Sequence, residues 1–256
     1  IKMRGITYIG RTFKRMQINR SMIIKTPPYL KKGDTIGITC PAGYMDAAKA
    51  QTCINTLQSW GFDVMVGKTL GSKSKNYFSG TDEERSDELQ AMLDDENINA
   101  ILFGRGGYGM GRIIDKLDFT KFKTNHKWVI GFSDITILHA HLYTKIKVAS
   151  LHAPMAAAFN EGENEFIQSL HKAIIGKKAK YSCAAHAFNK PGNVTAGLVG
   201  GNLCLLAHII GSPSDINTKN KILFIEDIGE QIYNTDRLLY QLKRSGKLAN
   251  LAGLIV

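Results

Sequence analysis

The sequence predicts an α/β protein: a parallel sheet with helices on both faces, followed by a smaller α/β unit. Three observations lead to this prediction. Short apolar segments alternate with amphipathic ones, the apolar segments are typical of strands buried on both faces, and turn signals separate the two kinds. The 256 residues, 44% of them apolar, are enough for one large domain or two modest ones with a proper core.

The first unit alternates strands and helices in a regular order. We expect strands at 35–40, 62–66, 100–103 and 128–130. We expect helices at 46–60, 82–93, 110–117 and 134–145. Gly61 ends the first helix, and Thr81 with Glu84 forms a capping box that begins the second.

The rhythm changes after about Pro154. The rest is expected to run as a helix at 164–175, a polar passage, a strand from Val194, a GGN turn, a helix at 202–210, a strand at 222–225, a helix at 234–243 and a strand at 251–256. We therefore expect a first domain over 28–155, a linker region over 156–190 and a partly barrel-like second domain over 191–256. Because LAGLIV stops inside an expected buried strand, we expect that domain to be truncated there.

The formal charge of +11 is concentrated at the start of the chain. Residues 1–33 carry nine Lys or Arg and no acid, which leaves 11 − 9 = +2 for the rest. We interpret residues 1–27 as a poorly ordered basic arm; contact with phosphate or a membrane surface is the alternative. The near-neutral remainder argues against nucleic acid as the partner. No signal peptide or membrane span is recognisable, so we expect a cytoplasmic protein that does not bind a membrane.

The four cysteines favour the same compartment. They form no C-x-x-C pair, and three of them lie in apolar strand or helix patterns, which is typical of reduced core thiols. Neither zinc-ligand spacing nor a convincing metal pair of histidines is present, so we expect no metal.

A glycine-rich segment, GRGGYGMG at 104–111, follows an expected strand and precedes an expected helix. Three interpretations are open: a nucleotide-binding loop, a structural tight turn, or a loop whose N–H groups bind another anion or an oxyanion. A dinucleotide site would have its loop after the first strand, with an acid about 20 residues on. Here the loop follows the third strand, and Asp115 and Asp118 come too early to be that acid, so the third interpretation is favoured.

Two further segments carry chemistry at strand ends. GFSDIT places Ser133 between a strand and a helix, as in a nucleophile elbow, although Ile135 replaces the second glycine of G-x-S-x-G. Alone, Ser133 is at least as well explained as a helix N-cap with Asp134 in the first turn. ILFIEDIGE brings Glu226 and Asp227 to a strand end, either for catalysis or as solvated capping acids.

Taken together, six ordered blocks over most of residues 28–256 resemble the LD-carboxypeptidase family of serine peptidases. The blocks are YFSGTDEERSDELQAMLDD (77–95), AILFGRGGYGMGRIIDKLDF (100–119), VIGFSDITILHAHLY (129–143), LHAPM (151–155), AGLVGGNLCLLAHIIGSP (196–213) and ILFIEDIGEQIYNTDRLLYQL (222–242). The resemblance implies removal of the terminal D-alanine from murein tetrapeptides in cell-wall recycling, by a Ser–Glu–His triad and an acyl-enzyme. It implies no cofactor, a small peptide as partner and a homodimer.

The resemblance also assigns roles by position. Ser133 is implied as the nucleophile and Glu226 as the triad carboxylate, and the backbone N–H groups of Gly107 and Asp134 as the oxyanion hole. The neighbouring residues implied to contact substrate are Arg105, Gly106, Tyr108 and His152.

The triad histidine is the departure from the family pattern. In the family it follows the strand that corresponds to LAGLIV, and none of the seven histidines of this sequence occupies that position. The open alternatives are a sister activity, a microcin-type immunity hydrolase that acts on a peptidyl nucleotide, and a muropeptide-binding homologue that lacks the histidine. A nucleotide-binding protein that uses the 104–111 loop is a weaker one.

Overall fold

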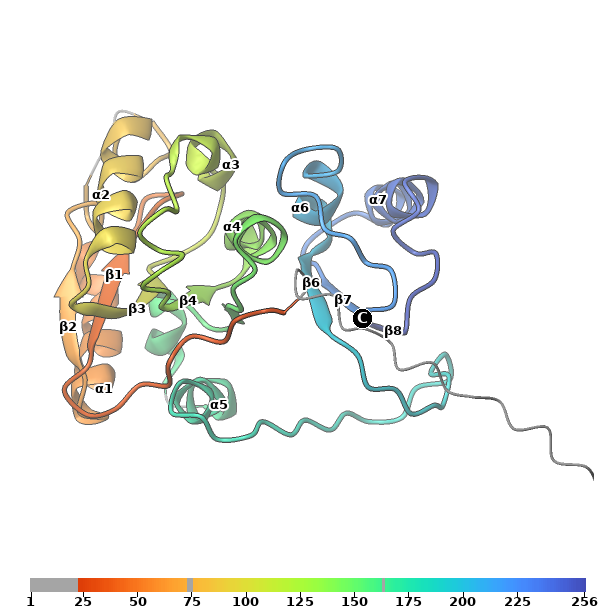
Figure 1. The fold of residues 1–256 in the computed structure, drawn as a ribbon, viewed down its shortest axis with the longest axis horizontal. Coiled ribbons are helices and arrows are strands. Elements are labelled where there is room, and N and C mark those ends of the chain that lie inside the picture. The colour runs from red at the N-terminus through yellow and green to blue at the C-terminus, as the bar shows by residue number, and fades with distance from the viewer. Residues whose placement is uncertain (1–22, 73–75, 163) are drawn as a thin grey trace, which may run out of the picture.

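The computed structural model describes residues 23–72, 76–162 and 164–256. Most of the expected basic arm therefore lies outside the described residues. The described chain forms two parallel sheets, each packed against helices (Figure 1). This confirms the predicted α/β class with a larger first sheet and a smaller second one.

The first sheet has five parallel strands in the order β2-β1-β3-β4-β5. They are β1 (Thr35–Thr39), β2 (Asp63–Val66), β3 (Ile98–Phe103), β4 (Trp128–Gly131) and β5 (Leu151–His152). The chain places β2 on one side of β1 and β3 on the other, so the direction in which the sheet grows reverses there. In open α/β sheets such a reversal leaves a crevice outside the carboxyl ends of the strands, where ligands bind.

Helices cover both faces of this sheet because its strands are apolar on both sides. Ala100 and Leu102 of β3 pack with α1 (Gln51–Ser59) and α5 (Glu165–Ile174). Ile101 and Phe103 pack with the helices of the other face, which are α2 (Asp82–Asp94), α3 (Met110–Ile113) and α4 (Thr136–His141). The two groups of helices are visible on opposite sides of the sheet in Figure 1.

Local signals decide where several of these helices begin. The predicted capping box is present: the Glu84 N–H donates to Thr81 Oγ1 (3.1 Å) and the Thr81 N–H donates to Glu84 Oε2 (2.7 Å). The helix expected at 134–145 is less regular than predicted. It consists of a 3₁₀ turn at Ser133–Ile135, then α4, then a π-helical turn at Leu142–Ile146.

The second sheet has three parallel strands, β6 (Leu198–Asn202), β7 (Ile222–Glu226) and β8 (Gly253–Ile255), in that order. Its helices are α6 (Leu203–His208) and α7 (Ile232–Arg244). The prediction of a GGN turn was wrong, because Gly200, Gly201 and Asn202 are the last residues of β6. A Cβ on Gly200 would lie 1.8 Å from the Phe224 carbonyl oxygen, and one on Gly201 2.6 Å from Thr136 Oγ1.

These close approaches connect the two sheets. The Asn202 N–H donates to Thr136 Oγ1 (3.1 Å), and one apolar cluster runs from Ile137 and Leu138 of α4 to Val199 and Leu223 of the second sheet. Asn202 is also the register partner of Glu226. The end of β7 is therefore held against the helix that follows Ser133.

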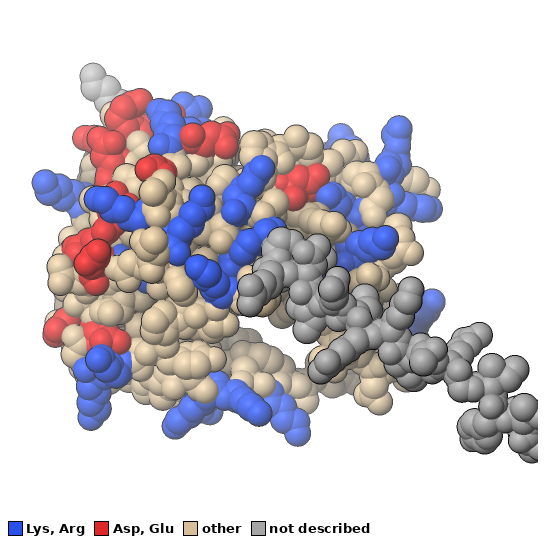
Figure 2. All heavy atoms as spheres, in the orientation of Figure 1, with Lys and Arg blue, Asp and Glu red and all other residues tan. Residues whose placement is uncertain are grey.

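The surface of the described chain carries both signs of charge. On the face shown in Figure 2, Lys and Arg side chains are spread over both halves of the molecule, whereas most acidic side chains gather over the half with the five-stranded sheet. No helix among the described residues is long and apolar enough to cross a membrane.

Candidate active site

Ser133 lies on a strained turn between β4 and α4. Its φ is +59°, in the left-handed region that costs a residue with a side chain about 1–2 kcal/mol. Its Oγ makes no hydrogen bond to another described residue, so it does not cap a helix amide as the N-cap interpretation requires. This strand–turn–helix geometry instead presents the hydroxyl at the carboxyl end of the sheet, as in a nucleophile elbow.

The Ser133 hydroxyl opens into a pocket of ≈ 710 Å³ at the point where the sheet reverses its direction of growth. The loops after β1, β3 and β4 and the turn at Ala156–Glu161 supply its walls. The lining residues are Tyr44, Met45, Asp46, Lys49, Arg105, Gly106, Gly107, Phe132, Ser133, Met155, Ala157, Ala158 and Glu161. This is the site that the strand order predicts, and it contains the nucleophile candidate and three residues of the glycine loop.

The glycine loop passes directly over Ser133, and this contact requires glycine. A Cβ on Gly106 would lie 2.8 Å from Ser133 Cβ and 2.9 Å from Ser133 Oγ. Gly107 has a φ of +112°, and a Cβ there would lie 2.1 Å from the Tyr77 hydroxyl. The backbone can approach the serine this closely only because Gly106 lacks a side chain, whereas Gly107 is required by its positive φ and by its contact with Tyr77.

The two backbone N–H groups expected to form an oxyanion hole are free to donate. Neither the Gly107 N–H nor the Asp134 N–H donates to another residue in the described ranges. The Asp134 side chain is fully buried, and its Oδ2 accepts the Met110 N–H at 2.7 Å. Burial raises the pKa of this carboxyl to about 6, against the opposing effects of that hydrogen bond and of the Arg85 charge.

Glu226 ends β7, and its carboxylate is close to His152 at the end of β5. The distance from His152 Nε2 to Glu226 Oε1 is 3.8 Å, and this oxygen is buried without a hydrogen-bond partner in the described chain. Burial, and then the charge of Asp227, raises the pKa of Glu226. Burial lowers the pKa of His152 to about 4, so its imidazole is neutral near pH 7 and the contact is not an ion pair.

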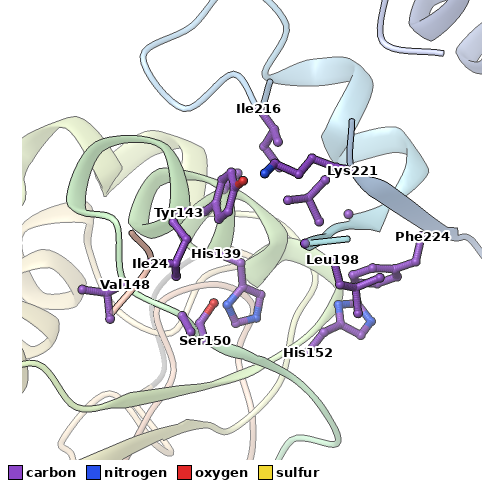
Figure 3. Close-up of a pocket in the computed structure, with 15 residues that line it drawn as sticks. Ile24, His139, Tyr143, Val148, Ser150, His152, Leu198, Ile216, Lys221 and Phe224 are labelled. Carbon is purple, nitrogen blue, oxygen red and sulfur yellow. The ribbon is translucent and has the colours of Figure 1, made fainter. Parts of the chain in front are cut away.

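His152 stands between the Ser133 turn and the second sheet. Its ring lies 6.0 Å from the Phe132 ring and 5.0 Å from the Phe224 ring, both edge-on. It also lines a neighbouring cavity of ≈ 250 Å³ together with His139, Tyr143 and Lys221. Figure 3 shows His152 beside Phe224 in that cavity. His152 thus contacts the Glu226 side of the site and does not line the Ser133 pocket.

The structure brings some of the expected residues together and separates others. Ser133, Arg105, Gly106 and Gly107 line one pocket, in which Arg105 Nη1 donates to the Tyr44 carbonyl at 3.0 Å. The Tyr108 side chain lies outside that lining, half-exposed, with its ring 5.7 Å from that of Phe78.

Sequence reasoning missed four polar lining residues: Tyr44, Asp46, Lys49 and Glu161. Tyr44 and Asp46 follow β1, at the point where the sheet reverses its direction of growth, so the strand order would have indicated them. Nothing in the sequence indicates Lys49 and Glu161 in the same way. They line the pocket because the turn at 156–161 packs on the segment before α1.

The fold and the pocket define a class of hydrolase, and comparison with known proteins identifies the family. Residues 36–153 match the LD-carboxypeptidase N-terminal domain, and residues 195–256 match the LD-carboxypeptidase C-terminal domain. The chain is 36% identical over 235 residues to a probable murein peptide carboxypeptidase of Bacillus subtilis strain 168, over 90% of this chain and 73% of that protein. It belongs to the LD-carboxypeptidase family and is a serine-type carboxypeptidase.

Two further known proteins are similar to this chain over most of its length. The crystal structure of muramoyltetrapeptide carboxypeptidase from Oxalobacter formigenes matches with a TM-score of 0.78 at 29% identity, over 86% of this chain and 75% of that one. Microcin C7 self-immunity protein MccF of Escherichia coli is 28% identical over 279 residues, over 92% of this chain and 79% of that protein. The resemblance inferred from the six sequence blocks is confirmed.

Proposed function

We propose that this carboxypeptidase removes the terminal D-alanine of murein tetrapeptides, with Ser133 as nucleophile. The observation that carries the proposal is the strained turn at Ser133, which packs against Gly106 at a contact that only glycine permits, next to the unpaired backbone N–H groups of Gly107 and Asp134. The names of the relatives in Bacillus subtilis and Oxalobacter formigenes support a murein peptide as the substrate.

In this mechanism Ser133 Oγ attacks the carbonyl carbon of the bond to D-alanine. It gives up its proton to the neutral imidazole of the triad histidine, which in the family pattern follows the strand that corresponds to β8. The carbonyl oxygen becomes an oxyanion that accepts hydrogen bonds from the Gly107 and Asp134 N–H groups. One such donor is typically worth about 3–4 kcal/mol in the transition state. The amine of D-alanine takes the proton and leaves, and water then hydrolyses the ester on Ser133.

Glu226 would orient that imidazole and stabilise its charged form. The raised pKa of Glu226 and its unpaired Oε1 support this role, because the oxygen is available to accept a hydrogen bond from the imidazole. His152 is not that histidine, because the family position follows the strand that corresponds to β8. His152 is a neighbour of Glu226 that packs beside its carboxylate. Arg105 supplies a cation in the pocket for the terminal carboxylate that distinguishes a carboxypeptidase substrate.

The proposal includes a setting in the cytoplasm, in the recycling of cell-wall peptides, and a homodimer. These three points rest on the family resemblance and on the reduced state of the cysteines, all four of which are free.

The test is incubation of the full-length protein with murein tetrapeptide, followed by mass spectrometry. The proposal predicts release of free D-alanine by the wild type and none above background by Ser133→Ala. Equal rates for the two proteins would refute it. Preferential hydrolysis of a peptidyl nucleotide would assign the protein to the microcin-type activity, and tight binding of tetrapeptide without release would make it a binding homologue.

A further inference from the structure

One peptide group of the glycine loop is held at both ends by buried charged side chains. The Gly109 carbonyl accepts a hydrogen bond from Arg85 Nη1 (3.3 Å), and the Met110 N–H donates to Asp134 Oδ2 (2.7 Å). Both side chains are fully buried. This peptide group lies two residues after Gly107, so its position sets where the loop leaves the site.

The same two side chains connect three loops of the pocket. Arg85 also donates to the Pro41 carbonyl in the loop after β1 and pairs with Asp82 at the start of its own helix. Asp134 directly follows Ser133 in the turn after β4. The loops after β1, β3 and β4 are thus fixed relative to one another by a buried network, in which the Gly109–Met110 peptide group connects Arg85 to Asp134.

The cost of this arrangement argues against a role in stability alone. Asp134 Oδ1 and Arg85 Nε are buried and have no hydrogen-bond partner in the described chain. A buried carboxyl with a single hydrogen bond is unfavourable, and an apolar side chain of similar size would pack there more cheaply. The presence of a carboxylate at position 134 is therefore explained by its hydrogen bond from the Met110 N–H.

We infer that the Asp134 side chain is a positioning residue of the oxyanion hole. Asp134 supplies one oxyanion donor through its own backbone N–H, and its carboxyl anchors the loop that carries the second donor, the Gly107 N–H. One residue thereby sets the distance between the two donors and their alignment with Ser133. The inference rests on the proposed function, because it assumes that Ser133 and these two N–H groups act on the substrate.

The inference predicts a loss in the chemical step rather than in substrate binding. Displacement of one donor by a fraction of an ångström affects the transition state more than the ground state. In the full-length protein, Asp134→Ala should lower kcat for D-alanine release by about 10- to 100-fold and change KM by less than about threefold. Asp134→Asn keeps an oxygen that can accept the Met110 N–H, and it should recover most of the lost rate.

A control separates positioning from general destabilisation. Ile98→Val removes one buried methyl group at the far end of β3 and should lower the stability measurably with kcat unchanged. Asp134→Val, which fills the same space without an acceptor, replaces Asp134→Ala should the alanine variant not fold. Amide hydrogen exchange over residues 104–110 gives a readout that needs no turnover: exchange should be faster in Asp134→Ala than in Asp134→Asn or Ile98→Val.

Two results would overturn the inference: a kcat for Asp134→Ala within twofold of Ile98→Val, or equal losses in Asp134→Asn and Asp134→Ala with unchanged loop exchange. Neither result touches the proposed function, which stands or falls with Ser133→Ala. An active Ser133→Ala variant would remove the proposed function, and the exchange data would still report whether Asp134 anchors the loop.

Discussion

Gly106→Ala tests the contact between the glycine loop and the nucleophile. Gly106 does not have a positive φ, so alanine is compatible with its backbone and the effect is steric. The added Cβ would lie 2.8 Å from Ser133 Cβ, whereas ordinary contacts begin at 3.4 Å, so loop and serine must separate by 3.4 − 2.8 = 0.6 Å. A misplacement of about 1 Å costs about 100-fold in rate, so we expect kcat to fall by about 10-fold or more.

The matched control is Gly111→Ala, the same substitution in the same segment. The nearest atom to its added Cβ is Ile137 Cδ1 at 3.3 Å, which is the end of a flexible side chain. Gly111 is helical, so alanine should be neutral or stabilising by up to about 1 kcal/mol. D-alanine release measures kcat, and urea unfolding shows the overpacking cost of about 1–3 kcal/mol expected for Gly106→Ala alone. Equal kcat values for the two variants would refute the close contact at Ser133.

Three further predictions follow from Ser133, Glu226 and Asp134. Because Ser133 has a left-handed backbone, Ser133→Gly should be about 1 kcal/mol more stable than Ser133→Ala in urea unfolding; equal stabilities would show that the turn is unstrained. Glu226→Gln should lower kcat by about 100-fold or more. Because burial raises the pKa of Glu226, the acid limb of the wild-type rate should lie above pH 4.5, and an acid limb unchanged in Glu226→Gln would exclude this carboxyl as its origin. Burial raises the pKa of Asp134 from 3.8 to about 6, although Arg85 of α2, His208 of α6 and the Met110 N–H all favour its charged form. The unfolded carboxyl ionises first as the pH rises, so this residue should remove up to about 3 kcal/mol of stability between pH 3.8 and pH 6. Unfolding curves at several pH values should show that slope in the wild type and a flatter one in Asp134→Asn, and parallel curves would contradict the buried ionisation.

Local signals in the sequence were sufficient for most of the fold. The apolar runs predicted four strands of the first sheet and the three of the second to within a few residues, but not the two-residue strand β5, which is too short to show a pattern. Thr81 and Glu84 form the predicted capping box because that motif involves only neighbouring residues. The GGN segment was misread because glycines usually mark turns. Here Gly200 and Gly201 belong to a strand whose backbone approaches Phe224 and Thr136, and these contacts are not local in the sequence.

The site was predictable in its residue types and not in its geometry. The glycines at 104–111 and the serine at 133 were identified from the sequence, and the structure places two of those glycines, Gly106 and Gly107, in one pocket with Ser133. The left-handed backbone of Ser133 could not be read from the sequence, since serine is a common N-cap in an ordinary conformation. The buried link from Asp134 to Met110 and Arg85 joins segments far apart in the chain, so only the packed fold reveals it.

The most direct test of the account is to trap the acyl-enzyme. Turnover of murein tetrapeptide by the full-length protein is quenched in acid within the first turnovers, and the peptide that contains Ser133 is analysed by mass spectrometry. We predict that this peptide gains the mass of the substrate acyl group that remains after D-alanine leaves, and that Gly106→Ala accumulates the adduct more slowly. D-alanine release with no adduct on Ser133, or an adduct on another residue, would contradict the assignment of the nucleophile.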